Sequence, residues 1–315
     1  MPARLLITLV LSLALAGPSW AVSQSARPLP LSADAVLLLD AQGKVLFSKN
    51  AAEDHAPASL VKLMTLYLAC EAIESDRAQW DEPVLISTRA AQTPRYRMGL
   101  RAGDTPPLRT LLEGVAIASA NDAATAVAEH LAGSEEAFVA QMNAKGAALG
   151  LSSTHFANAH GLPDPSGRST AEDLAKLTIR LLNDYPSSRP LLGGSTFVYR
   201  GRVYGRNISL LHDPWSVQAL KTGFTRAAGY NLAVATWRSG ERFVLIVLGA
   251  QTRSASYRDA RTVLSFGFQE AGLQVPPEPP QRRIQPPRRA AERRSRALAP
   301  HARPAASRPA AARSL

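Results

Sequence analysis

Apolar side chains are spaced as in β-strands near both ends of the central part of the chain. The runs 36–40 and 44–48 flank a short Gly-containing loop, which is typical of a β-hairpin. Three more strands are predicted near the far end, at 217–221, 231–237 and 242–248, the last two joined around Ser239-Gly240. We therefore predict one sheet assembled from distant parts of the sequence.

Helical periodicity dominates between these strands. Apolar residues recur every three to four positions over 60–74, which predicts a helix that starts near Ser59. The same pattern predicts helices over 108–118, 122–132, 135–149, 170–183 and 258–270. Ser134 and Thr170 are the expected N-caps of two of these, and Gly150 suits the end of one. The plan is α+β (mixed α/β): an antiparallel sheet flanked by helices, with a helical insert.

The N-terminal segment differs from this body. Residues 1–21 combine Arg4, an apolar run at 5–16 and small residues up to Ala21, as a cleaved signal peptide does. The run is short for a bilayer span; an uncleaved anchor or a buried strand is the alternative. We expect an exported, periplasmic protein with a linker at 22–33 and a folded domain at 34–272.

The C-terminal tail, 273–315, carries most of the positive charge. Residues 276–315 contain ten Arg, no Lys and two acids, which is +8 of the formal net charge of +11. The rest is mostly Pro and Ala, which bury too little apolar surface to offset the entropy of ordering, so we expect disorder. Since the body is nearly neutral, this charge does not indicate nucleic-acid binding. An anionic membrane or wall surface is the expected partner of the tail.

Cys70 is the only cysteine, so no intramolecular disulfide can form. A lone cysteine is sometimes a nucleophile. The apolar neighbours of Cys70 instead favour a small buried core residue.

Ser59 and Lys62 form the only Ser-x-x-Lys of the chain. At helical spacing, residues three apart lie on one face, so the hydroxyl and the amine can meet. Serine needs a neighbouring base to become a nucleophile. A lysine amine can act as a general base at neutral pH only if its pKa falls by ~3 units. Burial or a second cation nearby favours such a fall. Alone the motif is weak, because helix starts often carry Ser and Lys.

Two further motifs offer matching chemistry. Ser119-Ala120-Asn121 lies between two predicted helices and offers a hydroxyl to relay a proton and an amide to hold a carbonyl. Lys221-Thr222-Gly223 offers a cation and a hydroxyl for a carboxylate, and glycine permits close approach. Each alone is equally typical of an ordinary turn or strand end. Together, in this order, the three motifs are the signature of penicillin-binding proteins and serine β-lactamases.

The wider sequence resembles the low-molecular-mass D-alanyl-D-alanine carboxypeptidases, serine peptidase family S11. The matching stretches are 43–47, 57–65, 119–124, 155–158, 160–165, 169–174 and 221–232. The resemblance implies the transpeptidase fold of penicillin-binding proteins and serine β-lactamases. It also implies an enzyme that cleaves D-alanyl peptides of peptidoglycan through an acyl-serine intermediate and is inhibited by β-lactam antibiotics.

The catalytic residues implied by the resemblance come from the first two motifs. Ser59 would be the acylated nucleophile and Lys62 its general base. Ser119 would shuttle a proton, and Asn121 would bind the substrate.

The third motif supplies the implied substrate-binding residues. Lys221, Thr222 and Thr225 would hold the terminal carboxylate of D-Ala-D-Ala. The backbone N–H groups of Ser59 and Phe224, the latter next to Gly223, would form the oxyanion hole. No metal or organic cofactor is implied, and His155 and His160 are expected to be structural because a third ligand at convincing spacing is missing.

Some positions depart from the family pattern. Ala120 stands where glycine is usual in the second motif. Many members have an Arg before an aromatic residue near the last helix, where this chain has Ser256 before Tyr257. Arg253 or Arg258 are the candidate substitutes for that cation.

Three alternatives stay open. Members that lack the usual C-terminal β-domain and anchor include D,D-endopeptidases, and here the basic tail stands in that place. A class A-type β-lactamase would need a Glu on a loop after the second motif, but 152–164 contains none and Glu172 falls at a helix start. The third alternative is a non-catalytic module that binds the wall or the membrane. The intact motif residues argue against it.

Overall fold

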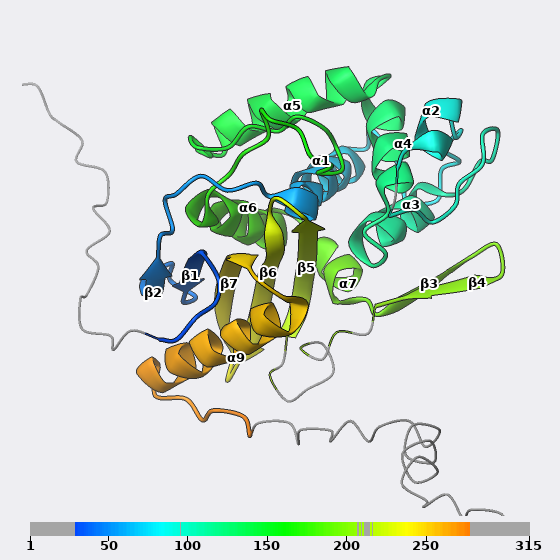
Figure 1. The fold of residues 1–315 in the computed structure, drawn as a ribbon. Coiled ribbons are helices and arrows are strands. Elements are labelled where there is room, and N and C mark those ends of the chain that lie inside the picture. Colours follow the sequence, from blue (N-terminus) through cyan, green and yellow to red (C-terminus); the bar gives the residue numbers. More distant parts are fainter. Residues whose placement is uncertain are drawn as a thin grey trace, which may run out of the picture. The chain divides into compact units, whose positions relative to one another are not determined.

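Five strands form one antiparallel sheet in the order β2-β1-β7-β6-β5, and strands from both ends of the described chain lie side by side in it (Figure 1). The computed structural model describes residues 29–277, except 95, 207, 209, 211–214 and 216. The strands are β1 (Ala35–Leu39), β2 (Val45–Lys49), β5 (Val217–Thr225), β6 (Gly229–Arg238) and β7 (Glu241–Ala250). The predicted assembly from distant segments is confirmed, since β1 pairs with β7.

Some predicted segments fall outside these residues. The signal peptide (1–21), most of the linker (22–33) and the tail beyond 277 lie outside the described residues. Within the described part of the chain, we find no helix with the length and apolar character needed to cross a membrane.

Helices cover both faces of the sheet. They are η1 (Ala58–Val61, a 3-10 turn), α1 (Lys62–Glu74), α2 (Thr88–Gln92), α3 (Leu108–Ala116), α4 (Asn121–Ala132), α5 (Glu135–Ala148), α6 (Ala171–Asp184), α7 (Ser188–Gly193) and α9 (Arg253–Glu270). α9 packs on one face, and α6 packs on the other. α1 contacts α6 and also the insert formed by α3, α4 and α5, so it joins the sheet to the insert.

The alternation of side chains along the strands produces two apolar cores. In β1, Leu37 and Leu39 face the core shared with α1 and α6. Val36 and Leu38 face the opposite core, where α9 contributes Phe268 and its neighbours. Because both faces of the sheet are covered, β7 contains a continuous buried apolar run at 243–248.

Most of the predicted elements are confirmed, with shifted ends. β5 continues through Thr225, past the predicted end at 221, because its pairing with β6 runs to the Thr225–Gly229 pair. The whole third motif therefore lies inside the strand. α9 begins five residues earlier than 258, capped by Thr252, whose hydroxyl accepts from the Ala255 N–H. Cys70 is fully buried, as predicted, and burial raises the pKa of its thiol to about 12.

Four short elements were not predicted. The helices α2 and α7 have five and six residues, too few to show a helical period. The strands β3 (Thr196–Tyr199) and β4 (Arg202–Gly205) form a separate hairpin that projects from the body (Figure 1). One face of this hairpin is anchored by Phe197 stacked on Tyr204, with ring centroids 5.0 Å apart.

Candidate active site

Ser59 lies in η1, where the chain turns from an extended segment into α1. The preceding Ala58 has φ 48°, a left-handed conformation that is unfavourable for a residue with a Cβ. Two glycines press against this turn: a Cβ on Gly161 would lie 2.0 Å from the Ala58 carbonyl oxygen, and one on Gly223 would lie 3.2 Å from the Ser59 nitrogen. Asn231 donates to the Pro57 carbonyl. The strained turn is therefore fixed by neighbours from three segments.

The Lys62 amine is fully buried beside Ser59. Its Nζ lies 3.1 Å from Ser59 Oγ, 2.7 Å from Asn121 Oδ1 and 2.5 Å from the His160 carbonyl oxygen. Burial lowers the pKa of Lys62 to about 7, against an opposing effect of the Asp122 carboxylate. The shift expected from the sequence thus has burial as its main cause.

Ser119 is linked to the second buried lysine. Its φ is 55°, so the chain between α3 and α4 also adopts a left-handed turn, and α3 ends at Ala116, earlier than predicted. Lys221 Nζ donates to Ser119 Oγ at 2.9 Å and to the Thr222 carbonyl oxygen at 2.9 Å. The pKa of Lys221 lies well below its usual value because of burial, with the nearby Lys62 and Arg206 cations adding to the effect.

Asn121 and Asp122 tie the start of α4 to the loop at 94–100. Asn121 Nδ2 donates to the Pro94 carbonyl at 3.0 Å while its Oδ1 faces Lys62. Asp122 is completely buried and accepts from the backbone N–H groups of Met98, Gly99 and Leu100 at 2.9–3.1 Å. The role of Asp122 could not be predicted from the sequence, because its three partners are more than twenty residues away.

The backbone carbonyl of His160 contacts Lys62, and the His160 ring contacts Glu135. The His160 Nε2 lies 3.4 Å from Glu135 Oε1, which also accepts from the Ala159 N–H at 3.0 Å. Burial, with the Lys62 and Arg89 charges, lowers the pKa of His160 to about 3, so the ring is neutral. Glu135 was not among the predicted site residues.

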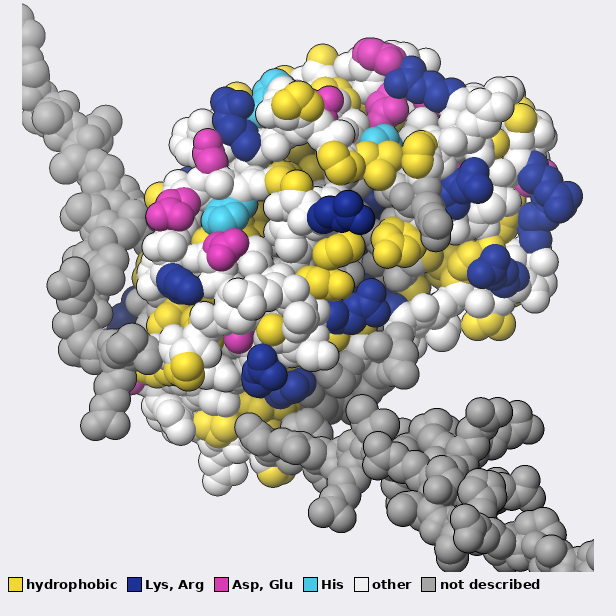
Figure 2. Space-filling view, in the orientation of Figure 1, with side chains coloured by type: hydrophobic (Ala, Val, Ile, Leu, Met, Phe, Trp, Pro, Cys, Tyr) yellow, Lys and Arg dark blue, Asp and Glu magenta, His cyan; other side chains and the backbone are white. Residues whose placement is uncertain are grey.

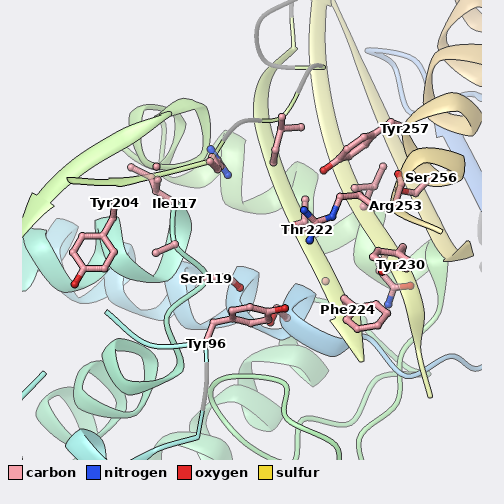
Figure 3. A pocket seen from close by; sticks show the side chains of 18 of the residues that line it. Tyr96, Ile117, Ser119, Tyr204, Thr222, Phe224, Tyr230, Arg253, Ser256 and Tyr257 are labelled. Atoms are coloured by element: carbon pink, nitrogen blue, oxygen red, sulfur yellow. The ribbon is translucent and has the colours of Figure 1, made fainter. Parts of the chain in front are cut away.

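A cavity of about 360 Å³ opens above Ser59 and Ser119. Figure 3 shows its two walls: Tyr96, Ile117, Ser119 and Tyr204 on one side, and Thr222, Phe224, Tyr230, Arg253 and Tyr257 on the other. The Phe224 ring stacks on Tyr230 with centroids 4.3 Å apart. Among the described residues that line this cavity, four are arginines (Arg97, Arg202, Arg206 and Arg253) and none is acidic.

The charge of the cavity suits an anion. Among the charged side chains at the centre and right of the face shown in Figure 2, most are Lys and Arg, whereas Asp and Glu gather toward the left and the top. Arg206 has a structural role, because its guanidinium donates to four backbone carbonyls, those of Gly194, Ala116, Leu220 and Leu192. Arg253 extends from α9 toward Thr222 (Figure 3). Of the two candidate substitutes named above, Arg253 is therefore the one that lines the cavity.

The structure brings most of the predicted site residues together. Hydrogen bonds connect Ser59, Lys62 and Asn121, and another joins Ser119 to Lys221. Thr222, Gly223 and Phe224 line the same cavity as Ser59. Thr225 instead lines a second cavity, and its hydroxyl accepts from the Ala228 N–H at 2.9 Å.

The chain is similar to known proteins of one family. A family model described as D-alanyl-D-alanine carboxypeptidase, of the S11 peptidases, matches residues 22–252. The chain belongs to this family. D-alanyl-D-alanine carboxypeptidase DacC of Escherichia coli (strain K12) is 36% identical over 258 residues, which cover 79% of this chain and 64% of the relative. DacA of the same organism is 34% identical, over 76% of this chain and 61% of the relative. The chain thus spans slightly less than two thirds of these relatives.

Solved structures of this carboxypeptidase family show the same fold. Penicillin-binding protein 6B from Escherichia coli superimposes with a TM-score of 0.74 and 32% identity, covering 80% of this chain and 82% of that one. Penicillin-binding protein D2 from Listeria monocytogenes, in a cefotaxime-bound form, gives a TM-score of 0.68 and 31% identity, covering 77% of this chain and all of that one. The predicted fold class is confirmed.

Proposed function

We propose that this member of the family is a serine-type D-Ala-D-Ala carboxypeptidase, which acts on peptidoglycan stem peptides through an acyl-Ser59 intermediate and binds β-lactams. The observation that carries the proposal is the Ser59–Lys62 pair: a hydroxyl 3.1 Å from a buried amine whose pKa is about 7. An amine with this pKa is partly neutral at neutral pH, as a general base must be.

The contacts of Lys62 support its role as that base. Asn121 Oδ1 and the His160 carbonyl oxygen can only accept, so they orient two N–H bonds of the amine. In the neutral amine the lone pair is then left for the Ser59 hydroxyl. Ser59 Oγ would form a bond to the carbonyl carbon of the substrate while its proton passes to Lys62.

Breakdown of the tetrahedral intermediate needs an oxyanion site and a proton for the leaving amine. The backbone N–H groups of Ser59 and Phe224 would stabilise the oxyanion, each worth about 3–4 kcal/mol if removal behaves as in other acyl transferases. Ser119, hydrogen-bonded to Lys221, would pass a proton to the leaving D-alanine as the C–N bond breaks. Water then hydrolyses the ester and regenerates Ser59.

The leaving D-alanine carries a free carboxylate, and the cationic wall of the cavity would bind it. Thr222 and Arg253 line the cavity and offer a hydroxyl and a guanidinium, and the buried Lys221 amine lies behind the lining, bonded to Ser119. Thr225 was expected to share this role, and its position in the second cavity makes Arg253 the better candidate. Charge-assisted hydrogen bonds of this kind are stronger than neutral ones.

Labelling with a fluorescent penicillin, followed by product analysis on purified muropeptides, tests the proposal. We expect wild type to be labelled and to release single D-alanine residues, Ser59→Ala to be unlabelled, and the remote Ser75→Ala to behave as wild type. Cleavage of crosslinked dimers would instead indicate a D,D-endopeptidase, and sustained nitrocefin turnover a β-lactamase. An unlabelled wild type would contradict the proposed mechanism.

The site of action is part of the same proposal. An exported enzyme would meet its substrate in the periplasm, and the ten arginines of 276–315 would attach it weakly to an anionic membrane or wall surface. Deleting 276–315 is expected to reduce binding to sacculi or anionic vesicles at low ionic strength. Unchanged binding would refute this role of the tail.

A further inference from the structure

Asp122 is completely buried in the first turn of α4, next to Asn121. Its carboxylate accepts from three successive backbone N–H groups, at 98–100, over 2.9–3.1 Å, and from the Ala123 N–H at 3.0 Å. All four donors are backbone groups, so these bonds stabilise the carboxylate without neutralising its charge. The N-terminal end of a helix also favours an anion. The structure thus places a negative charge inside the protein, beside the site.

The N–H groups at 98–100 belong to a loop that forms part of the wall of the first cavity. Tyr96, in this loop, lines the cavity on the side opposite Phe224 (Figure 3). Asn121 holds the loop at one point, because its backbone N–H donates to the Tyr96 carbonyl at 2.6 Å. Asp122 adds the three bonds at 98–100. A displaced loop would therefore change both the cavity wall and the position of Asn121.

Asn121 links the position of this loop to Lys62. One end of its amide, Nδ2, donates to the Pro94 carbonyl, and the other end, Oδ1, lies 2.7 Å from Lys62 Nζ. Because the two ends of an amide are held in one plane, its orientation toward Lys62 depends on where the Pro94 carbonyl lies. Asp122 fixes the same loop a few residues further along, so it acts on Lys62 through Asn121.

The charged groups around Lys62 act in different directions. The Asp122 carboxylate of α4 raises the pKa of Lys62, against the larger effect of burial. The Lys221 amine of β5 is a nearby cation. The His160 ring is neutral, since its pKa lies at about 3, and Glu135 behind it pairs with a surface arginine. Asp122 is therefore the anion that opposes the effect of burial on this amine.

We propose that Asp122 is a positioning residue with two separable effects: its hydrogen bonds fix the wall of the cavity, and its charge strengthens Lys62 as a base. This inference rests on the proposed function, in which Lys62 takes the proton of Ser59. A nearby anion favours the protonated amine, so proton uptake by Lys62 becomes more favourable. Without this charge, Lys62 would lose its proton at lower pH and would be a weaker base. The hydrogen bonds act separately, by keeping the reacting groups in place.

Asp122→Asn tests both effects in the full-length protein, with acylation by a fluorescent penicillin followed as a function of pH. Each carboxylate oxygen accepts from two of the four backbone N–H groups, so the amide loses one pair of these bonds as well as the charge. We expect the midpoint of the pH profile to fall below the wild-type value of about 7 by about half a unit or more. The plateau rate at high pH should fall by about tenfold.

Two further variants separate the charge from the position of the loop. Tyr204→Phe removes the hydroxyl that donates to the Met98 carbonyl, which loosens the same loop without changing the charge near Lys62. Its plateau rate should fall by about two- to fivefold, the effect of one hydrogen bond, with the midpoint at the wild-type value. Asp104→Asn is the control, because Asp104 pairs with Arg200 at 2.7 Å on the surface. It should match wild type in both midpoint and plateau.

Asp122→Glu covers the case in which Asp122→Asn folds poorly. It keeps the charge but lengthens the side chain, so its midpoint should stay near the wild-type value while its plateau rate falls. A midpoint shifted as far as in an uncharged variant would contradict the role of the charge. In wild type, the N–H groups at 98–100 should be protected from hydrogen exchange, because Asp122 binds them. Rapid exchange there would overturn the positioning effect.

Two outcomes would overturn the inference while leaving the proposed function intact. One is a wild-type midpoint in folded Asp122→Asn. The other is an equal shift in Tyr204→Phe, which would assign the effect to the loop and not to the charge. Failure of the proposed function is distinct, because then penicillin does not label Ser59 in the wild-type protein.

Discussion

Two lysines are buried to the same degree in this site, and their surroundings differ. Lys62, at the start of α1, has three acceptors around its amine and the Asp122 carboxylate nearby. Lys221, in β5, has two acceptors and two cations, Lys62 and Arg206, close to it. Burial lowers the pKa of both amines, but the neighbouring charges act in opposite directions.

This difference indicates that the two lysines have different functional roles. The pKa of Lys62 is about 7, so this amine can take up and release a proton near neutral pH. Lys221 lies among cations and behind Ser119, which lines a cavity where no described lining residue is acidic. A bound carboxylate would stabilise this environment. One lysine thus suits a base, and the other suits an anion-binding site.

The largest expected effect comes from Lys62→Met, which removes the base but keeps the volume. Acylation by a fluorescent penicillin should slow by about 10²–10⁴-fold, the usual contribution of general-base catalysis. In wild type the rate should rise with pH through about 7 as Lys62 loses its proton, and this step should vanish in the variant. A variant that acylates at the wild-type rate would show that Lys62 is not the base.

The same substitution has a stability consequence of definite sign. The pKa of Lys62 is about 7 in the folded protein against 10.5 ordinarily, so the unfolded chain binds more protons between these values. The penalty of burying the amine is therefore greatest at pH 7 and below and decreases as pH rises toward 10.5. We expect Lys62→Met to raise the free energy of unfolding at pH 7 by about 1–3 kcal/mol, measured by denaturant titration, and by less at pH 10.

Lys221→Met is expected to have a smaller effect of a different kind. Loss of a charge-assisted contact to the substrate carboxylate should lower kcat/KM for D-Ala-D-Ala peptides by about tenfold to a hundredfold. The pH step near 7 should persist, because Lys62 remains. The exposed Lys44→Met, at the β1–β2 turn, is the control and should match wild type. If both lysine variants lost the pH step, the division of roles between them would be wrong.

The roles of Lys62 and Lys221 could be predicted from the sequence to different extents. Ser59 and Lys62 are three residues apart at a helix start, so local geometry alone predicts that they meet. Ser119 and Lys221 are 102 positions apart, and only the order of the motifs and the family resemblance suggested that both belong to one site. Spacing in the sequence thus predicts a contact between side chains when both residues lie on one helix, because the helical period brings them to the same face.

The supporting residues could not be predicted in the same way. Glu135 is the first residue of α5, where an acidic side chain is common for its effect on the helix dipole. Its contact with His160 depends on how the loop after α5 folds back over α1. The sheet and its two cores were predictable because alternation along a strand is local, whereas the partners of a buried carboxylate depend on tertiary packing.

Glu135→Gln is expected to have the smallest effect and tests whether the surroundings of Lys62 set its behaviour. Gln keeps an acceptor for the Ala159 N–H but removes the charge that faces His160 and Arg89, so the His160 carbonyl should orient Lys62 less well. We expect acylation to slow by about three- to tenfold, with a shift in the pH midpoint, since such supporting residues act by fixing geometry. Glu136→Gln is the matched control, because Glu136 pairs with the same Arg89 at 2.7 Å on the surface and exposed pairs contribute little. Equal behaviour of the two variants would mean that burial alone, and not the Glu135–His160 contact, determines the properties of Lys62.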